Sequence, residues 1–368
     1  MPTVSLVIPT YNEAAVIRQK LENVLQLDYP REKLEVVVVD SASSDETVSI
    51  VKKFAGEHRR EINLVLTEQP VRRGKSEAIN EALRSVRSEI MVLTDADVTF
   101  PPLSVRKLVE NFEGSEIGAV SGVEVPVGGR SFLTAIEADY RRIYTAIRMA
   151  EAETDTPFMC ESELSAYRRD ILEPLRPGSV CDDVELTVCI RSKGFKAVYA
   201  PEVSFFETEA VNLRPKLQHK LRRGMNNQHA LVQNSKVLFN RGFGRYGTLV
   251  FPFEFFVHMV SPILLTISLF FLLILGIFSP VSALLALLAT AILSLPALGV
   301  THSLVNRYRE GDVALLRGTG SWIFGAAAFL GFQLVLLVGL LKLGFKGPQL
   351  NWQQVPGTRV PIPVEASG

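Results

Sequence analysis

Two aspartates, Asp95 and Asp97, follow a short apolar run over residues 90–93 that is typical of a buried strand. Side chains alternate along a strand, so residues two apart point the same way. Both carboxylates can therefore reach one divalent cation at the carboxyl end of the strand, the edge where open α/β sheets bind ligands. Hard cations such as Mg²⁺ and Mn²⁺ prefer oxygen ligands and often bridge carboxylates to substrate phosphates. The alternative is a structural pair that caps the helix after Pro101 and Pro102.

Further polar residues stand where other apolar runs end. The first run leads into Pro9-Thr-Tyr-Asn-Glu13, and the second ends at Asp40, which can accept hydrogen bonds from a base or ribose. Asp45, at a helix start, is expected to act as a cap. The carboxyl ends of parallel strands share one edge, so these residues are expected near the aspartate pair.

A basic, glycine-containing helix start at Gly74-Lys75-Ser76 suits an anionic phosphate. It is not a phosphate loop of the nucleoside-triphosphatase type, because the required upstream glycine position holds Gln69. A second helix start carries Asp182 and Asp183. Acids there are often only caps, but two in succession also suit a general base.

The elements that must position these residues lie in the first half of the chain. Short apolar runs alternate with helical patterns, which predicts an α/β fold with a mostly parallel sheet covered on both faces. The runs are residues 4–8, 36–39, 64–66, 90–93 and 119–123, and the helical patterns are 13–27, 46–54, 76–86 and 103–112.

Composition excludes some classes of function. The 368 residues include 39 basic and 39 acidic ones, so no overall field favours nucleic acid. Cys160, Cys181 and Cys189 lack the spacing of metal ligands, and their odd number argues against a disulfide framework. We interpret them as buried thiols in a reducing compartment.

The second half of the chain is far more apolar. Residues 249–278, 281–305 and 321–343 form three apolar stretches, each long enough to span a bilayer, which needs about 20 residues. Basic residues in the flanking loops place the large domain on the cytoplasmic side. We therefore predict an integral protein of the cell membrane, although Lys342 and Lys346 leave the number of spans and the side of the tail open.

Two features adjoin this region. Residues 214–245 are basic with amphipathic spacing, which suits either an anionic membrane surface or a solvated helix face. Glu254 and His258 lie one helical turn apart in the first apolar stretch. We expect them at the membrane interface; the alternative is that they face the protein and touch a polar acceptor group.

Together these residues resemble the family 2 glycosyltransferases, which have a GT-A fold that binds a nucleotide-diphospho-sugar. The resemblance covers about residues 4–225. It rests on Ile8-Pro-Thr-Tyr-Asn-Glu13, Asp40-Ser-x-Ser-x-Asp45-x-Thr47, Gly74-Lys-Ser-x-Ala-x-Asn80, Asp95-x-Asp97, Asp182-Asp-x-Glu-Leu186 and Gly194-Phe.

The resemblance implies roles for individual residues. Asp40 should contact the nucleotide base and Asp95 the nucleotide-sugar, Asp97 should hold Mn²⁺ or Mg²⁺ on the diphosphate, and Asp183 should be the catalytic base beside Asp182. The remaining predicted substrate-binding residues are Pro9, Tyr11, Glu13, Lys75, Arg222 and Arg223.

A mechanism follows from these roles. The metal would neutralise charge on the departing nucleoside diphosphate. Asp183 would take a proton from the acceptor hydroxyl as it attacks the anomeric carbon, and a single displacement inverts configuration. If the acceptor is a lipid phosphate, a base is less necessary, and Asp183 would orient the acceptor instead.

One departure bears on the type of transferase. Processive synthases of the cellulose and hyaluronan type carry Gln-x-x-Arg-Trp, whereas this chain has Gln218-His-Lys-Leu-Arg222-Arg223 and no tryptophan there. In the segment on the acceptor side, Glu161 and Glu163 replace a usually glycine-rich sequence, and they either face a hydroxylated acceptor or have structural roles.

We therefore predict a hexosyltransferase that moves a sugar from a UDP- or GDP-sugar to a lipid-linked or glycan acceptor, with membrane lipids and no nucleic acid as partners. The alternatives are a processive polysaccharide synthase and a non-catalytic nucleotide-sugar-binding membrane subunit. The expected regions are a catalytic domain over 1–212, an interfacial segment over 213–248, a transmembrane region over 249–345 and a tail over 346–368.

Overall fold

The structure, a computed structural model, describes residues 1–368 except 128–131, 209–211, 310–321, 348–358 and 363–368. The described part of the first half forms an eight-stranded sheet in the order β3-β2-β1-β4-β7-β6-β8-β5. The strands are β1 (Val4–Thr10), β2 (Leu34–Asp40), β3 (Asn63–Glu68), β4 (Ile90–Thr94), β5 (Val98–Thr99), β6 (Ile117–Val127), β7 (Leu164–Arg168) and β8 (Lys196–Thr208).

Strands β1 to β4 pair in parallel, and β7 runs antiparallel between β4 and β6. The predicted α/β fold with a mostly parallel sheet is thus confirmed. The connecting helices are α1 (Ile17–Leu25), α2 (Thr47–Glu57), α3 (Lys75–Ser85), α4 (Ser104–Glu110) and α6 (Asp182–Ser192).

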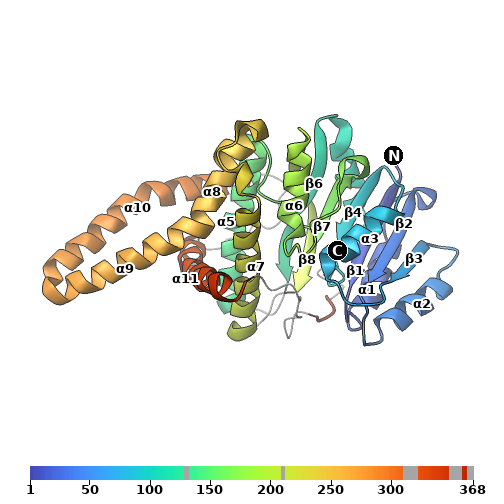
Figure 1. The fold of residues 1–368 in the computed structure, drawn as a ribbon, viewed down its shortest axis with the longest axis horizontal. Coiled ribbons are helices and arrows are strands. Elements are labelled where there is room, and N and C mark those ends of the chain that lie inside the picture. Colours follow the sequence, from blue (N-terminus) through green and yellow to red (C-terminus); the bar gives the residue numbers. More distant parts are fainter. Residues whose placement is uncertain (128–131, 209–211, 310–321, 348–358, 363–368) are drawn as a thin grey trace.

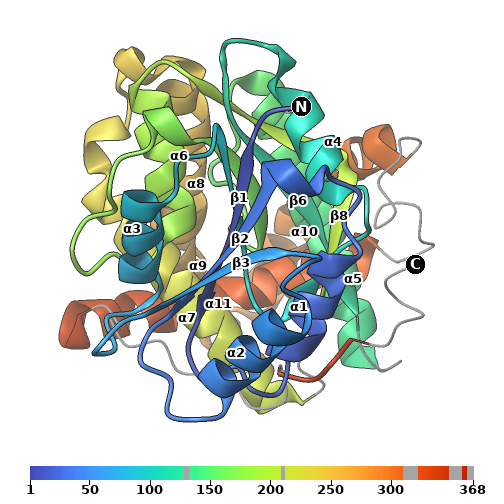
Figure 2. The same cartoon turned by 90° about the vertical axis from the view of Figure 1, so that its right-hand side faces the viewer.

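The central strands β1, β2 and β4 are buried on both faces because they are apolar at successive positions. In β2, Val36 and Val38 belong to one core cluster, whereas Val37 and Val39 belong to the other. The first cluster includes residues of α1, α2 and α4, and the second includes residues of α3 and α6. Figure 2 shows α3 and α6 on the side of the strands opposite α1. Continuous apolar strands of this kind are typical of parallel sheets covered by helices.

Two long helices, α5 (Phe132–Thr154) and α7 (Leu213–Gln233), stand between the sheet and the apolar helices (Figure 1). α7 packs against α11 (Trp322–Lys346), where a Cβ at Gly224 would lie 2.9 Å from Leu336. The basic segment therefore includes a helix enclosed between two parts of the protein.

The apolar helices extend away from the sheet. Residues Tyr246–Phe278 run through η6 (Tyr246–Val250), α8 (Phe251–Phe255), η7 (Phe256–Val260) and α9 (Ser261–Phe278), and the first and third of these segments are π-helical. α9 then forms a hairpin with α10 (Pro280–Arg309).

Two helices of the described chain are long and apolar enough to cross a membrane: Tyr246–Phe278 and Ala328–Phe345. Only 6% and 22% of their most apolar windows are buried, whereas a core helix would be mostly buried. A shorter apolar segment, Pro280–Thr290, lies in α10. The expected count of three spans stays a prediction.

Candidate active site

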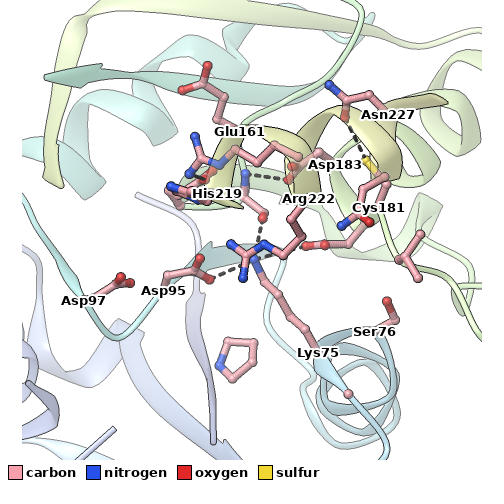
Figure 3. Close-up of a pocket in the computed structure, with 18 of the residues that line it drawn as sticks. Lys75, Ser76, Asp95, Asp97, Glu161, Cys181, Asp183, His219, Arg222 and Asn227 are labelled. Carbon is pink, nitrogen blue, oxygen red and sulfur yellow. Dashed lines mark hydrogen bonds and ion pairs between the residues drawn. The ribbon is translucent and has the colours of Figure 1, made fainter. Parts of the chain in front are cut away.

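A cavity of about 450 Å³ lies at the carboxyl edge of the sheet, where α5 and α7 face it. It collects side chains from segments far apart in the sequence. All the predicted site residues except Asp40 line it: Pro9, Tyr11, Glu13, Lys75, Asp95, Asp97, Asp182, Asp183, Arg222 and Arg223. Figure 3 shows Asp95 and Asp97 on one side of this space and Asp183 on the other.

The aspartate pair follows β4 directly, and both side chains reach the cavity. Asp97 is almost buried, with 4% of its side chain exposed, and it forms an ion pair with Arg359 from the C-terminal tail. Arg359 Nε also lies 2.7 Å from Glu13 Oε2. The Arg359 guanidinium is therefore already paired with Asp97, and a carboxylate buried to this extent suits a positively charged ligand.

The carboxylates of this site fit a metal ion that is bound jointly by the protein and by the phosphates of a substrate. Among the described residues no group of three or more His, Cys, Asp or Glu side chains is placed to enclose a cation. Mg²⁺ and Mn²⁺ are commonly held by one or two carboxylates together with substrate phosphates. Asp97, with Asp95 beside it, can supply the one or two carboxylates of such a site.

Lys75 connects the two acidic parts of the site. Its Nζ lies 2.8 Å from Asp95 Oδ1, 3.4 Å from Asp182 Oδ2 and 2.7 Å from Ser162 Oγ (Figure 3). Gly74, at φ 87°, makes the turn that starts α3 with Lys75. Burial by itself lowers the pKa of Lys75, but the surrounding aspartates raise it well above its usual range.

Asp182 and Asp183 begin α6, as the sequence suggests. Asp183 Oδ1 accepts a hydrogen bond of 2.8 Å from the Ser162 backbone N–H, which fixes the carboxylate in the cavity wall. Burial raises the pKa of Asp183 well above its usual range, with Asp182 and Glu163 adding to the effect. A carboxyl group with a raised pKa is a stronger base when it is ionised.

α7 supplies the basic wall of the cavity. Arg223 is paired with three carboxylates, at 2.8 Å from Glu163, 3.2 Å from Glu207 and 3.6 Å from Glu124. Burial and the neighbouring Arg223 lower the pKa of Arg222 to about 10, so Arg222 stays charged at neutral pH. This wall can accept an anionic ligand.

The opposite end of the cavity reaches the apolar helices. Tyr140 and Tyr144 of α5, His258 of η7 and Phe332 of α11 line it. The sequence gives no signal for Tyr140, Tyr144 and Phe332, because each belongs to an ordinary helical pattern. His258 has a signal in its spacing from Glu254, and contact with a polar acceptor group is one of its two interpretations. These residues become neighbours only when α5, η7 and α11 pack together.

The expectation that Glu254 and His258 lie at a membrane interface is wrong. Their exposed fractions are 2% and 3%; Glu254 Oε2 lies 3.1 Å from His258 Nδ1, and Glu254 forms an ion pair with the fully buried Arg148. Both residues thus face the protein, because Arg148 of α5 offers a partner for the buried carboxylate.

Asp40 and Tyr11 flank the first strands. Asp40 is 1% exposed, and its carboxylate accepts hydrogen bonds from Thr10 Oγ1 and from the N–H and Oγ of Ser43. Its contact with a base stays a prediction. Tyr11 lies under Arg72, whose guanidinium carbon is 3.8 Å from the centre of the tyrosine ring. Both residues line the cavity.

Comparisons with known proteins agree with this geometry. Residues 5–176 match the family model described as glycosyl transferase family 2. The chain is 30% identical over 244 residues to the probable glycosyltransferase YdaM of Bacillus subtilis (strain 168). This match covers 63% of this chain and 57% of that protein. It is 26% identical over 237 residues to an N-acetylglucosaminyltransferase of Azorhizobium caulinodans, covering 60% of this chain and 58% of that protein. The matches therefore span a little under three fifths of these relatives.

A solved structure matches over more of the chain. The mannosyltransferase PcManGT from Pyrobaculum calidifontis, in complex with GDP-Man and Mn²⁺, superimposes with a TM-score of 0.72 at 28% identity. The match covers 93% of this chain and 86% of that one, so it includes the apolar helices as well as the sheet. The family model, the relatives and the shared GT-A architecture lead to one conclusion: residues 5–176 form a glycosyl transferase family 2 domain.

Proposed function

We propose that the protein is an inverting, metal-dependent glycosyltransferase that moves a sugar from a nucleotide-diphospho-sugar to a membrane-associated, lipid-linked acceptor. The observation that carries the proposal is the cavity, in which Asp97, Lys75, Arg222 and Asp183 meet. The likeness to a mannosyltransferase that binds GDP-Man and Mn²⁺ supports a GDP- or UDP-sugar donor and a divalent cation.

On the donor side, Asp97 would hold the cation with Asp95 beside it. Arg222 or Arg223, which both line the cavity, would bind the diphosphate. When bound, a divalent cation supplies Lewis-acid stabilisation of the charge on the leaving nucleoside diphosphate. Lys75 adds a positive charge next to Asp95 and holds it in place.

On the acceptor side, Asp183 would accept the proton of the attacking hydroxyl. The Ser162 N–H holds one of its oxygens, which leaves the carboxylate oriented in the cavity wall. Attack from the side opposite the leaving group inverts the anomeric carbon. The raised pKa of Asp183 makes it better suited to taking a proton near neutral pH.

The acceptor is proposed to be lipid-linked because the cavity continues to the apolar helices. His258 and Phe332, which line its far end, belong to the two stretches able to cross a membrane. An acceptor anchored in the bilayer would reach Asp183 from that end. We place the catalytic domain on the cytoplasmic side of the cell membrane, following the basic residues Arg241 and Arg245 before the first span.

A single transfer rather than polymer synthesis is our proposal, since the Gln-x-x-Arg-Trp motif of processive synthases is altered at Gln218 and Arg222. A subunit that binds donor without turnover is disfavoured by the placement of Asp97 and Asp183 in one cavity.

The test is release of nucleoside diphosphate by the detergent-purified chain. UDP- and GDP-sugars are compared with and without lipid extract, in Mn²⁺ or in EDTA. Turnover of one donor that needs the metal, rises with lipid and is lost in Asp183→Asn supports the proposal. Asp170→Asn, which changes an exposed aspartate, is the matched control. Donor binding without turnover under every condition would refute it in favour of a non-catalytic subunit.

A further inference from the structure

Helix α1 buries a lysine among apolar residues. Its buried positions include Ile17, Leu21 and Val24, at the spacing of one helix face, and Lys20 lies on that face with 1% of its surface exposed. An unpaired ammonium group is costly to bury, and a methionine would fill the same space without a charge. Burial lowers the pKa of Lys20, and Asp95 partly offsets this.

Lys20 makes two hydrogen bonds that enclose the segment with the aspartate pair. Its Nζ donates to Thr94 Oγ1 at 2.6 Å, just before Asp95, and to the Val98 carbonyl oxygen at 3.0 Å, just after Asp97. One side chain therefore fixes both ends of a turn that carries the two carboxylates.

Asn23, one helical turn later, continues this contact. Its Nδ2 donates to the Phe100 carbonyl oxygen at 2.8 Å, and its Oδ1 accepts from the Phe100 N–H at 3.1 Å. The Lys20 ammonium also lies 4.2 Å from the centroid of the Phe100 ring. Side chains of α1 thus hold the chain from Thr94 to Phe100 through four hydrogen bonds.

Neither Lys20 nor Asn23 lines the cavity. They contact the turn from the core side, so Asp95 and Asp97 are left to face the cavity. Mg²⁺ requires near-ideal octahedral geometry, and ligands held by packed, hydrogen-bonded neighbours bind it better than ligands free to move.

We propose that Lys20, assisted by Asn23, is a positioning residue that holds the Asp95–Asp97 turn in the geometry that binds the divalent cation. The inference rests on the proposed function, in which Asp97 carries the metal. It adds a residue that touches neither metal nor donor and acts through the backbone and Thr94.

The test measures Mn²⁺ binding by the detergent-purified full chain without donor, from the electron paramagnetic resonance signal of free Mn²⁺. Lys20→Met should weaken binding by about tenfold, the size of effect typical of groups that orient metal ligands. Asn23→Ala, which removes only the contacts at Phe100, should weaken it by a smaller factor, and it carries the test if Lys20→Met does not fold.

Val51→Ala is the matched control, because it truncates a fully buried core residue of α2 outside the cavity lining. It should lower the unfolding temperature while leaving the Mn²⁺ affinity unchanged.

Two results would overturn the positioning role of Lys20 while leaving the proposed function intact. Equal Mn²⁺ affinity in wild type, Lys20→Met and Asn23→Ala would make the lysine purely structural. Tighter binding in Lys20→Met would mean that its charge repels the cation more than its hydrogen bonds position the carboxylates. Absence of Mn²⁺ binding by the wild-type chain, with a nucleoside diphosphate present as well as without one, would instead refute the metal role in the proposed function, and the positioning role with it.

Discussion

Replacing Lys75 with methionine tests whether one cation holds the two acidic parts of the site together. The Lys75 ammonium lies within 3.4 Å of both Asp95 and Asp182. Removing one partner of a fully buried ion pair costs about 3–5 kcal/mol. The Lys75 and Asp95 side chains are each 26% exposed, so solvent screens part of their attraction. We therefore expect Lys75→Met to lower the free energy of unfolding by about 2 kcal/mol. For a domain of this size, that lowers the unfolding temperature by about 4–8 °C.

The pH dependence of this loss has a defined sign. Burial alone would raise the pKa of Asp95, but Lys75 brings it below its ordinary value. A carboxylate with a lowered pKa in the folded state contributes stability above its unfolded pKa of about 3.9, and that contribution is lost as the pH falls through the folded value. The difference between wild type and Lys75→Met should therefore be full at pH 7 and shrink in acid.

The assay is thermal and denaturant unfolding of Lys75→Met, Asp95→Asn and the double variant at pH 7. The cycle should give a coupling energy of about 1–2 kcal/mol, since the residues touch. Lys53→Met is the matched control, because Lys53 is 73% exposed and 4.0 Å from Glu57, and it should change stability little. Additive losses at Lys75 and Asp95, or a Lys75 effect no larger than that of Lys53→Met, would refute the reasoning.

Three further predictions concern turnover and metal binding. Asp183→Asn should lower kcat by about 10²–10⁴-fold while leaving the donor Kd unchanged, since the Asn Oδ1 still accepts from the Ser162 N–H; equal losses in both would contradict a role as base. Glu163→Gln removes a negative charge that raises the pKa of Asp183, so the acidic limb of the kcat/KM profile should move to lower pH, and an unmoved limb would exclude Asp183 as the titrating group. Arg359→Ala removes the guanidinium that competes with Mn²⁺ for Asp97, so it should tighten Mn²⁺ binding by roughly tenfold, equivalent to about 1.4 kcal/mol. Weaker binding would show instead that Arg359 helps to hold the metal.

Much of the α/β core could be predicted because its information is local. Apolar runs such as residues 34–40 bury alternate side chains on both faces, which indicates a covered parallel sheet without any knowledge of distant contacts. The aspartate pair after β4 and the acids at the start of α6 stand where strands and helices end, and the sheet topology then brings them to one edge.

The predicted site was less complete on the side of the apolar helices. Tyr140, Tyr144 and Phe332 line the cavity through the packing of α5 and α11, and their local sequence is that of ordinary helices. His258 also lines it, and the sequence marks this residue only by its spacing from Glu254. Glu254 was expected at an interface, but it is buried because Arg148, over a hundred positions earlier, pairs with it. Such ion pairs depend on tertiary contacts that no local pattern contains.

By itself the sequence determined the α/β architecture, the motif residues at the carboxyl edge of the sheet and the presence of long apolar helices, because hydrophobic periodicity and helix starts are properties of neighbouring residues. Only the tertiary structure decided that Lys75 bridges two acidic groups, that Lys20 holds the aspartate turn from the core, and that Arg359 stands on Asp97. Each of these contacts joins residues at least 20 positions apart, and the energy of a buried charge depends on the partners that folding brings to it.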